Sequence, residues 1–173
     1  MDEVARLLHA FGSRGKHDHV AWKLDILMDL GRINEPRVVP FLADVVADPE
    51  EPAAVRLDAL GWLREAASRP DQSAARAVAA TTCLMVLRPQ ADDDLRLHAA
   101  LVVGDFTDVP GVLAALGTLA QDPTESIELR YNAFTSLQRA GPASECLALL
   151  RALAADETLG QSATALLVSW GTR

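Results

Sequence analysis

An internal repeat constrains the fold of this chain more than any other feature of its sequence. Residues 34–63 and 108–137 align with each other without a gap. Both segments contain a Pro near the start, an apolar stretch, an Asp-Pro pair and an Arg eight residues after the Asp. Long stretches rich in Ala, Leu, Arg and Glu lie between Pro, Gly and Asp, and this pattern predicts helix. Each copy is therefore predicted to be a helical hairpin, with Pro36 or Pro110 at the start of the first helix and the Asp-Pro pair in the turn.

Weaker copies of the hairpin extend over the rest of the chain. The residue equivalent to the Arg of the two clear copies defines offset 0, and the intervals between copies are 33, 40, 34 and 30 residues. Offset 0 is occupied by Lys23, Arg56, Arg96, Arg130 and Gly160. Offsets −1, +3, +4, +7 and +10 are apolar in every copy except at Thr164, and this spacing places them on one side of a helix.

We therefore expect an all-α chain that forms a single domain over residues 1–173. The expected architecture is an α-solenoid of about five antiparallel helical hairpins, because each hairpin can bury its apolar side only against its neighbours. The first helices of the hairpins are expected near residues 2–11, 36–47, 71–87, 108–120 and 142–155.

The hairpins resemble those of the HEAT-repeat family, which carry an Asp in the turn and an Arg early in the second helix. Asp48 with Arg56, and Asp122 with Arg130, match that pattern. The resemblance implies a HEAT-like superhelix in which these side chains form a ladder between repeats, and by itself it implies no enzyme. Two departures make the ladder incomplete: the interval from Asp to Arg is longer than usual, and Gly160 replaces the last Arg. Armadillo and tetratricopeptide repeats are the nearest alternatives.

Offsets +2, +6 and +9 are predicted to form the solvent-facing line of each second helix, because they lie opposite the apolar offsets. By resemblance to the family, the second helices line a concave side where partners bind. Offset +6 includes Ser136 and Leu166, and it also places Trp62 and Val102 among acidic side chains. The predicted partner-binding residues are Asp25, Asp29, Asp58, Trp62, Glu65, His98, Val102, Asp105, Asn132 and Arg139.

This line predicts a groove that binds a basic or mixed-charge protein segment. Trp62 would be its apolar anchor, and the carboxylates would steer the partner and fix its register. In the alternative interpretation the acids only solvate the helices, and Trp62 is covered by a neighbouring turn or fills a gap between repeats. The burial of Trp62 distinguishes the two interpretations.

The charge of the chain argues against two classes of partner. A net charge of −8 and a pI of about 4.9 disfavour binding to nucleic acid and to anionic membranes. The amino terminus is acidic and no apolar run approaches the length of about 18 residues that spans a bilayer, so a cytoplasmic location is expected. Cys83 and Cys146 lack paired spacing and are expected to be reduced, semi-buried thiols, with a disulfide as the alternative.

Short motifs give little indication of metal binding, phosphate binding or catalysis. His17 and His19 could be metal ligands, but a polar loop between helices explains them without a metal. Gly15-Lys16 lacks the spacing of a phosphate-binding loop, and Asp92 to Asp94 precede a helix whose amino terminus they are expected to cap. No nucleophile with a His partner is evident, and we expect neither a cofactor nor a catalytic residue.

Three functions compete on this evidence. The first is a noncatalytic protein-binding scaffold or adaptor, which includes an immunity or inhibitor protein that binds a basic target. The second is a HEAT-like enzyme. An alkylbase DNA glycosylase is disfavoured because it needs a basic cleft and the predicted groove is acidic. A bilin lyase remains an alternative, because its chemistry leaves no compact sequence motif. The third is self-assembly as a homodimer through the last hairpin, because residues 165–170 carry no charge.

Overall fold

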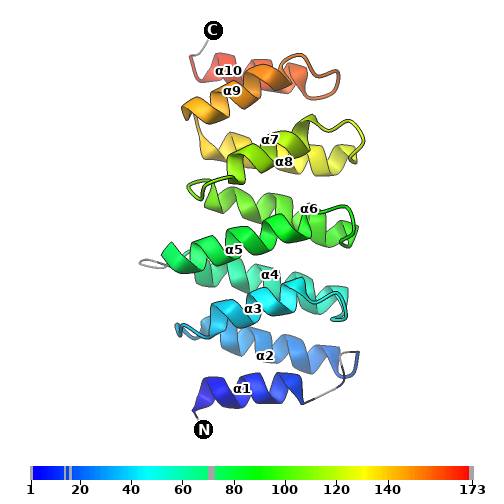
Figure 1. Cartoon of the computed structure of the whole chain (residues 1–173), viewed down its shortest axis with the longest axis vertical. Helices are drawn as coiled ribbons and strands as arrows, with labels where there is room; N and C mark the ends of the chain where they lie inside the picture. Colours follow the sequence, from blue (N-terminus) through cyan, green and yellow to red (C-terminus); the bar gives the residue numbers. More distant parts are fainter. Residues whose placement is uncertain (1, 14, 16, 70–72, 172–173) are drawn as a thin grey trace. The chain divides into compact units, whose positions relative to one another are not determined.

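The computed structural model describes residues 2–13, 15, 17–69 and 73–171, and this part of the chain is helical and contains no strand (Figure 1). The prediction of an all-α chain is confirmed. The chain divides into two compact units, Met1–Ala99 and Ala100–Arg173, which are described separately below. The prediction of a single domain stays a prediction.

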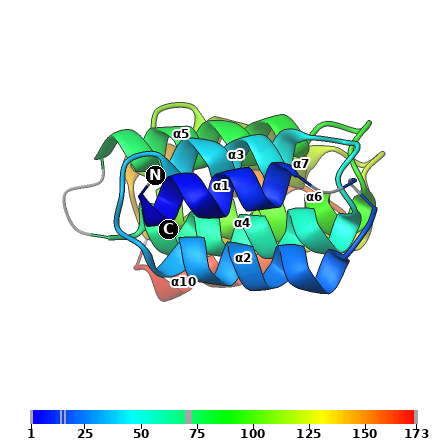
Figure 2. The same cartoon turned by 90° about the horizontal axis from the view of Figure 1, so that it is seen from below.

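Unit 1 consists of two layers of helices. Figure 2 shows α1, α3 and α5 in one layer and α2 and α4 in the other. α3 packs on α4 and α5, and α2 packs on α1 and α4. The helices are α1 (Glu3–Gly12), α2 (Val20–Arg32), α3 (Val38–Ala47), α4 (Ala53–Ala67) and α5 (Ser73–Val86); α6 (Asp93–Val102) begins in unit 1 and ends in unit 2.

Unit 2 continues from the end of α6 into the 3₁₀ helix η1 (Val103–Phe106). α7 (Val112–Gln121) packs on α8 (Ile127–Ala140) and on α9 (Ser144–Leu153), and α9 packs on α10 (Gly160–Ser169). α1, α3, α5, α7 and α9 coincide within a few residues with the predicted first helices; residue 71, the predicted start of the third, lies outside the described residues.

The predicted apolar offsets form the cores of the two units. All ten side chains at offsets +3 and +7 are buried, among them Ala59 and Leu63 of α4 and Ala133 and Leu137 of α8. At the ends of the pattern, Trp22 and Trp170 are half-buried, and Thr164 is exposed. Small residues at offset +3 beside large residues at +7 thus let neighbouring helices pack closely.

Local sequence explains where several helices begin and end. Asp2 caps α1 by accepting a hydrogen bond from the Ala5 amide (2.8 Å), and Ser126 caps α8 in the same way. Asp92 caps α6, as predicted, with its carboxylate 3.1 Å from the Leu95 amide nitrogen. The prediction that Pro36 and Pro110 start helices is wrong by two residues: α3 begins at Val38 and α7 at Val112. Both prolines lie in the turn that leads into the helix.

The basic side chain at offset 0 joins the two helices of a hairpin. Nε of Arg56 donates to the Val46 carbonyl (2.9 Å), and Nε of Arg130 donates to the Ala120 carbonyl (2.9 Å). Arg96 donates in the same way to the carbonyl of Leu87 (3.1 Å). Each guanidinium thus satisfies a carbonyl at the end of the first helix, where intrahelical partners run out.

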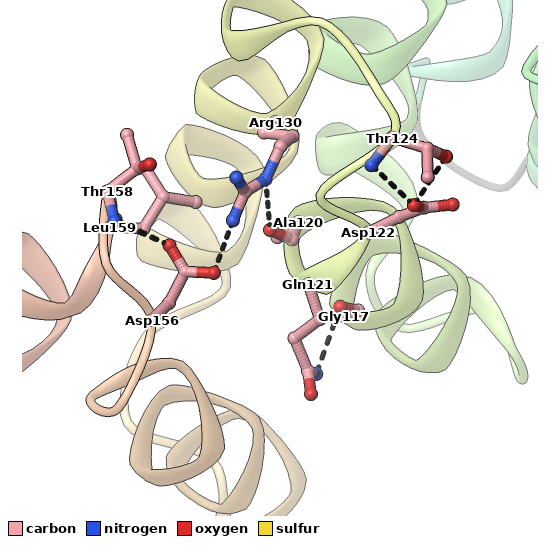
Figure 3. Close-up of polar contacts among 9 residues, drawn as sticks. All are labelled: Gly117, Ala120, Gln121, Asp122, Thr124, Arg130, Asp156, Thr158 and Leu159. Atoms are coloured by element: carbon pink, nitrogen blue, oxygen red, sulfur yellow. Dashed lines mark hydrogen bonds and ion pairs between the residues drawn. The ribbon is translucent and has the colours of Figure 1, made fainter.

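Two of these cations also reach the turn of the following hairpin. Nη2 of Arg130 lies 2.5 Å from the Asp156 carboxylate (Figure 3). Lys23 lies 2.8 and 2.7 Å from the two carboxylate oxygens of Glu51, and both of these side chains are buried. We call such a contact between an offset-0 cation and an acid of the next turn a rung. Each of these two rungs joins two consecutive hairpins of one unit.

The last hairpin carries glycine at offset 0 for a steric reason. A Cβ added at Gly160 would lie 2.7 Å from the carbonyl oxygen of Ala154. The turn before α10 therefore passes too close for any side chain at this position.

We expect Lys23→Met to lower the free energy of unfolding by about 3–5 kcal/mol, because it leaves the Glu51 carboxylate buried without a counter-charge. The measurement is urea unfolding at pH 7. The double variant Lys23→Met/Glu51→Leu should recover most of the loss, and Arg6→Ala, which removes an exposed ion pair with Glu3, should cost less than about 1 kcal/mol. A loss below about 1 kcal/mol for Lys23→Met would show that this rung does not hold unit 1 together.

Candidate protein-binding surface on the second helices

The predicted partner-binding residues fall into an exposed group and a half-buried group. Asp25, Asp29, Glu65, His98 and Arg139 are exposed. The other five are half-buried: Asp58, Trp62, Val102, Asp105 and Asn132. None of the ten lies in a dry core, so the predicted rotational phase of the second helices is correct at offsets +2 and +9.

The prediction for offset +6 is wrong in two of five copies. Ser136 is fully buried, and Leu166 is 9% exposed. Ser136 donates to the Ala100 carbonyl (2.6 Å), and a Cβ added at Gly104 would lie 2.4 Å from its Oγ. At Ser136, offset +6 therefore faces the preceding second helix and not the solvent, because Gly104 at offset +8 of that helix allows close approach.

Trp62 follows the same rule in unit 1. A Cβ added at Gly31, at offset +8 of α2, would lie 2.3 Å from Cε3 of the indole ring. One face of Trp62 is thus packed on the α2 backbone, and the ring is half-buried. The alternative interpretation, in which Trp62 fills a gap between repeats, accounts for this face of the ring. The rest of the ring lies at the surface and is available for contact.

The indole of Trp62 also holds Asp58. Its Nε1 donates to Oδ2 of Asp58 at 3.1 Å. Burial raises the pKa of the Asp58 carboxyl above its ordinary value, and the hydrogen bond from Trp62 opposes this shift. The carboxylate is thus partly desolvated on the outer surface that α2 and α4 share. We call this surface the α2–α4 face.

The α2–α4 face combines acidic and apolar side chains. Asp25, Asp29 and Glu65 are exposed, and among the described residues none of them forms an ion pair. Sequence reasoning missed the apolar part, which occupies offsets +1 and +5 and is half-buried. Its members are Leu24, Met28 and Leu57. The signal was present in the sequence, because offset +1 is Leu in the first three copies and Tyr in the fourth.

Gly61 lies in the middle of α4 on this face. It is exposed, and a Cβ added there would meet nothing within 4 Å. A glycine inside a helix costs about 1 kcal/mol relative to alanine, and packing within the described residues gives no reason for it. The α4 backbone is therefore open to close approach from outside.

Unit 2 presents a different second-helix surface. Asp105 forms an ion pair with Arg139, whose Nη1 also donates to the Leu101 carbonyl (2.9 Å). These two predicted partner-binding residues thus neutralise each other. Between α8 and α10 lies a shallow hollow of about 390 Å³, lined by Phe134, Gln138, Ser162, Ala165, Leu166 and Ser169. Gln138 and Leu166 occupy the offsets, +8 and +6, at which Gly31 and Trp62 meet in unit 1. Here no indole ring fills the space.

The remaining sequence motifs do not add a reactive site. Cys83 and Cys146 are free thiols, as predicted, but both are completely buried and not semi-buried. Burial raises the pKa of Cys83 to about 12, which keeps it protonated. His17 and His19 are exposed, and His19 adopts a left-handed conformation before α2. No group of three His, Cys, Asp or Glu suited to a metal ion occurs among the described residues.

Comparison with known proteins does not assign the chain to a family. No protein-family model, curated protein or solved structure matches it. Within the described residues, no helix combines the length and apolar character required to cross a membrane.

We expect Gly31→Ala to displace Trp62 from α2, because the added methyl group would overlap the ring. In a Trp22→Phe/Trp170→Phe background, the fluorescence of Trp62 should shift to longer wavelength and the free energy of unfolding should fall by about 1–3 kcal/mol. Gly61→Ala is the matched control on the open side of α4, and it should stabilise the protein by about 1 kcal/mol. Equal effects of the two substitutions would contradict the packing of Trp62 on Gly31.

The raised pKa of Asp58 predicts a specific pH dependence. The Asp58 carboxyl has a higher pKa in the folded state than in the unfolded state. Its stabilising contribution to the free energy of unfolding is therefore complete below the pKa of the unfolded state and is lost as pH rises through the pKa of the folded state. Asp58→Asn, whose side-chain oxygen still accepts the Trp62 hydrogen bond, should therefore gain stability relative to the wild type between about pH 3 and pH 7. Urea unfolding across this range tests it, and a relative loss toward pH 7 would show that the Trp62 bond outweighs burial.

Proposed function

We propose that this chain is a noncatalytic protein-binding scaffold or adaptor, built as a HEAT-like α-solenoid of five helical hairpins. The second helices carry the binding surface. The observation that carries the proposal is the α2–α4 face, where exposed carboxylates without ion pairs surround half-buried apolar side chains and an open helix backbone at Gly61.

The chemistry of this face favours a basic or mixed-charge protein segment. Asp25, Asp29 and Glu65 add negative potential that attracts Lys and Arg side chains and speeds association. Leu24, Met28, Leu57 and the outer part of Trp62 offer apolar contact area, which supplies most of the affinity in protein interfaces. A partner segment with apolar residues on one side and basic residues on the flanks satisfies both requirements.

A quantitative affinity capture from cell extract tests the proposal. Trp62 packs on α2, so its removal would disturb the fold, and the exposed carboxylates are the better probes. We expect the triple variant Asp25→Asn/Asp29→Asn/Glu65→Gln to capture at least tenfold less partner than the wild type. Raising the salt concentration from 50 to 500 mM should weaken capture by the wild type. The readout is label-free mass spectrometry.

Glu128→Gln/Glu145→Gln/Glu157→Gln is the control, because it makes the same change in charge at exposed positions of unit 2. It should capture the partner like the wild type. If the two triple variants behave alike, or if neither the wild type nor the control retains a specific protein, the α2–α4 face is not the binding surface.

A further inference from the structure

The turn between α5 and α6 departs from the turns of the two clear copies, in which an Asp lies eight residues before offset 0. Asp48-Pro49 and Asp122-Pro123 lie eight residues before Arg56 and Arg130. At the same interval before Arg96, the chain has Arg88-Pro89. Glu51 of the rung with Lys23 lies five residues before offset 0, and the equivalent residue here is Ala91. This turn therefore carries a cation at the position of Asp48 and Asp122, and it lacks an acid at the position of the rung acid Glu51.

The rung that Arg56 would make with this turn is consequently open. Arg56 is only 8% exposed, and its Nε donates to the Val46 carbonyl as in the other hairpins. Among the described residues its guanidinium has no second hydrogen bond and no ion pair. Asp92, at the offset of Asp156, is exposed and caps the Leu95 amide. A nearly buried cation thus lacks the counter-charge that Arg130 and Lys23 have.

A hollow of about 280 Å³ lies where the missing acid would be. Arg56, Arg88, Gln90, Pro49 and Met85 line it. No buried polar side-chain atom lacks a partner in the described part of the chain, so the free Nη groups of Arg56 are not enclosed and lie at the wall of this hollow. Arg88 is exposed and has no side-chain partner among the described residues. Two arginines therefore line one unfilled space.

An apolar trough adjoins the hollow. It runs between α3 and α5, has a volume of about 410 Å³, and shares Ala47 and Met85 with the hollow. Pro40, Ala43, Ala77 and Val78 form much of its wall, and Met85 is 43% exposed. A ligand that places a charged group at Arg56 can thus lay apolar groups along α3 and α5.

We propose that this open rung binds the carboxylate of an Asp or Glu side chain from a protein partner, whose neighbouring apolar side chains occupy the trough. The other rungs supply the argument for a carboxylate, since Asp156 and Glu51 fill the equivalent place inside the molecule. Guanidinium groups bind carboxylates through strong, charge-assisted hydrogen bonds, and removal of an uncompensated buried charge adds to the gain. Arg56 belongs to α4, but the site shares no residue with the α2–α4 face and does not rest on the function proposed for it.

Isothermal titration calorimetry with two blocked peptides tests the proposal. The probes are acetyl-Leu-Ala-Ala-Leu-Ala-Glu-amide and the same peptide ending in Gln, each titrated into the full chain. The Glu peptide should bind at least tenfold more tightly than the Gln peptide. Ala91→Glu, which places an acid at the position of the rung acid Glu51, should fill the rung internally, abolish Glu-peptide binding and raise Tm by about 2–4 °C.

Ala152→Glu is the control, because it makes the same substitution at an exposed position on α9. It should alter neither binding nor Tm. Three results would each overturn the proposal: equal binding of the two peptides or none, an Ala91→Glu variant that binds and melts like the wild type, or inorganic phosphate that binds more tightly than the Glu peptide. The last result would assign the site to a free oxyanion and not to a partner's side chain.

Discussion

The contact between an offset-0 cation and the end of the preceding helix determines the geometry of the hairpins. Arg56, Arg96 and Arg130 each donate through Nε to a carbonyl that the first helix leaves unpaired. A long cationic side chain is suited to this position because its stem lies in the core while its head satisfies main-chain and carboxylate oxygens. Where the cation also meets an acid of the next turn, one side chain fixes two hairpins at once.

This contact also determines which side of each second helix meets the solvent. With offset 0 directed at the first helix, offset +6 is turned toward the preceding second helix at Trp62 and Ser136, and offsets +2 and +9 stay outside. Glycines at offset +8 then decide how close the helices come, as the contacts of Gly31 with Trp62 and of Gly104 with Ser136 show. The acidic and apolar face of α2 and α4 is thus a consequence of the rotation that the cations impose.

Periodicity was sufficient to predict the helices, the buried offsets and the basic position, because burial on one side of a helix leaves a spacing of three and four in the sequence. It failed at offset +6. Ser136 is buried because Gly104 of the neighbouring helix lies opposite, and that depends on the neighbour and not on the residue itself. The pairing of Asp105 with Arg139 was likewise beyond sequence reasoning, because it brings together residues from separate elements.

The open rung was visible in the sequence as Ala91 at the position of Glu51, next to Arg88-Pro89 in place of Asp-Pro, but its meaning required the structure. Only the structure relates Arg56 to the turn that follows and shows the unfilled space between them. The same interaction that stabilises the other hairpins is incomplete here, so a structural position becomes a position for a ligand. The surface of α2 and α4 and the open rung thus derive from one repeated contact.

Side-chain NMR of the arginines tests this claim most directly, through the exchange of their Nε protons and the rotation of their guanidinium groups. The account predicts slowly exchanging Nε protons for Arg56, Arg96 and Arg130, together with restricted Nη rotation for Arg130 and free Nη rotation for Arg56. Equal restriction of the Nη groups of Arg56 and Arg130, or rapid exchange of the three Nε protons, would contradict it.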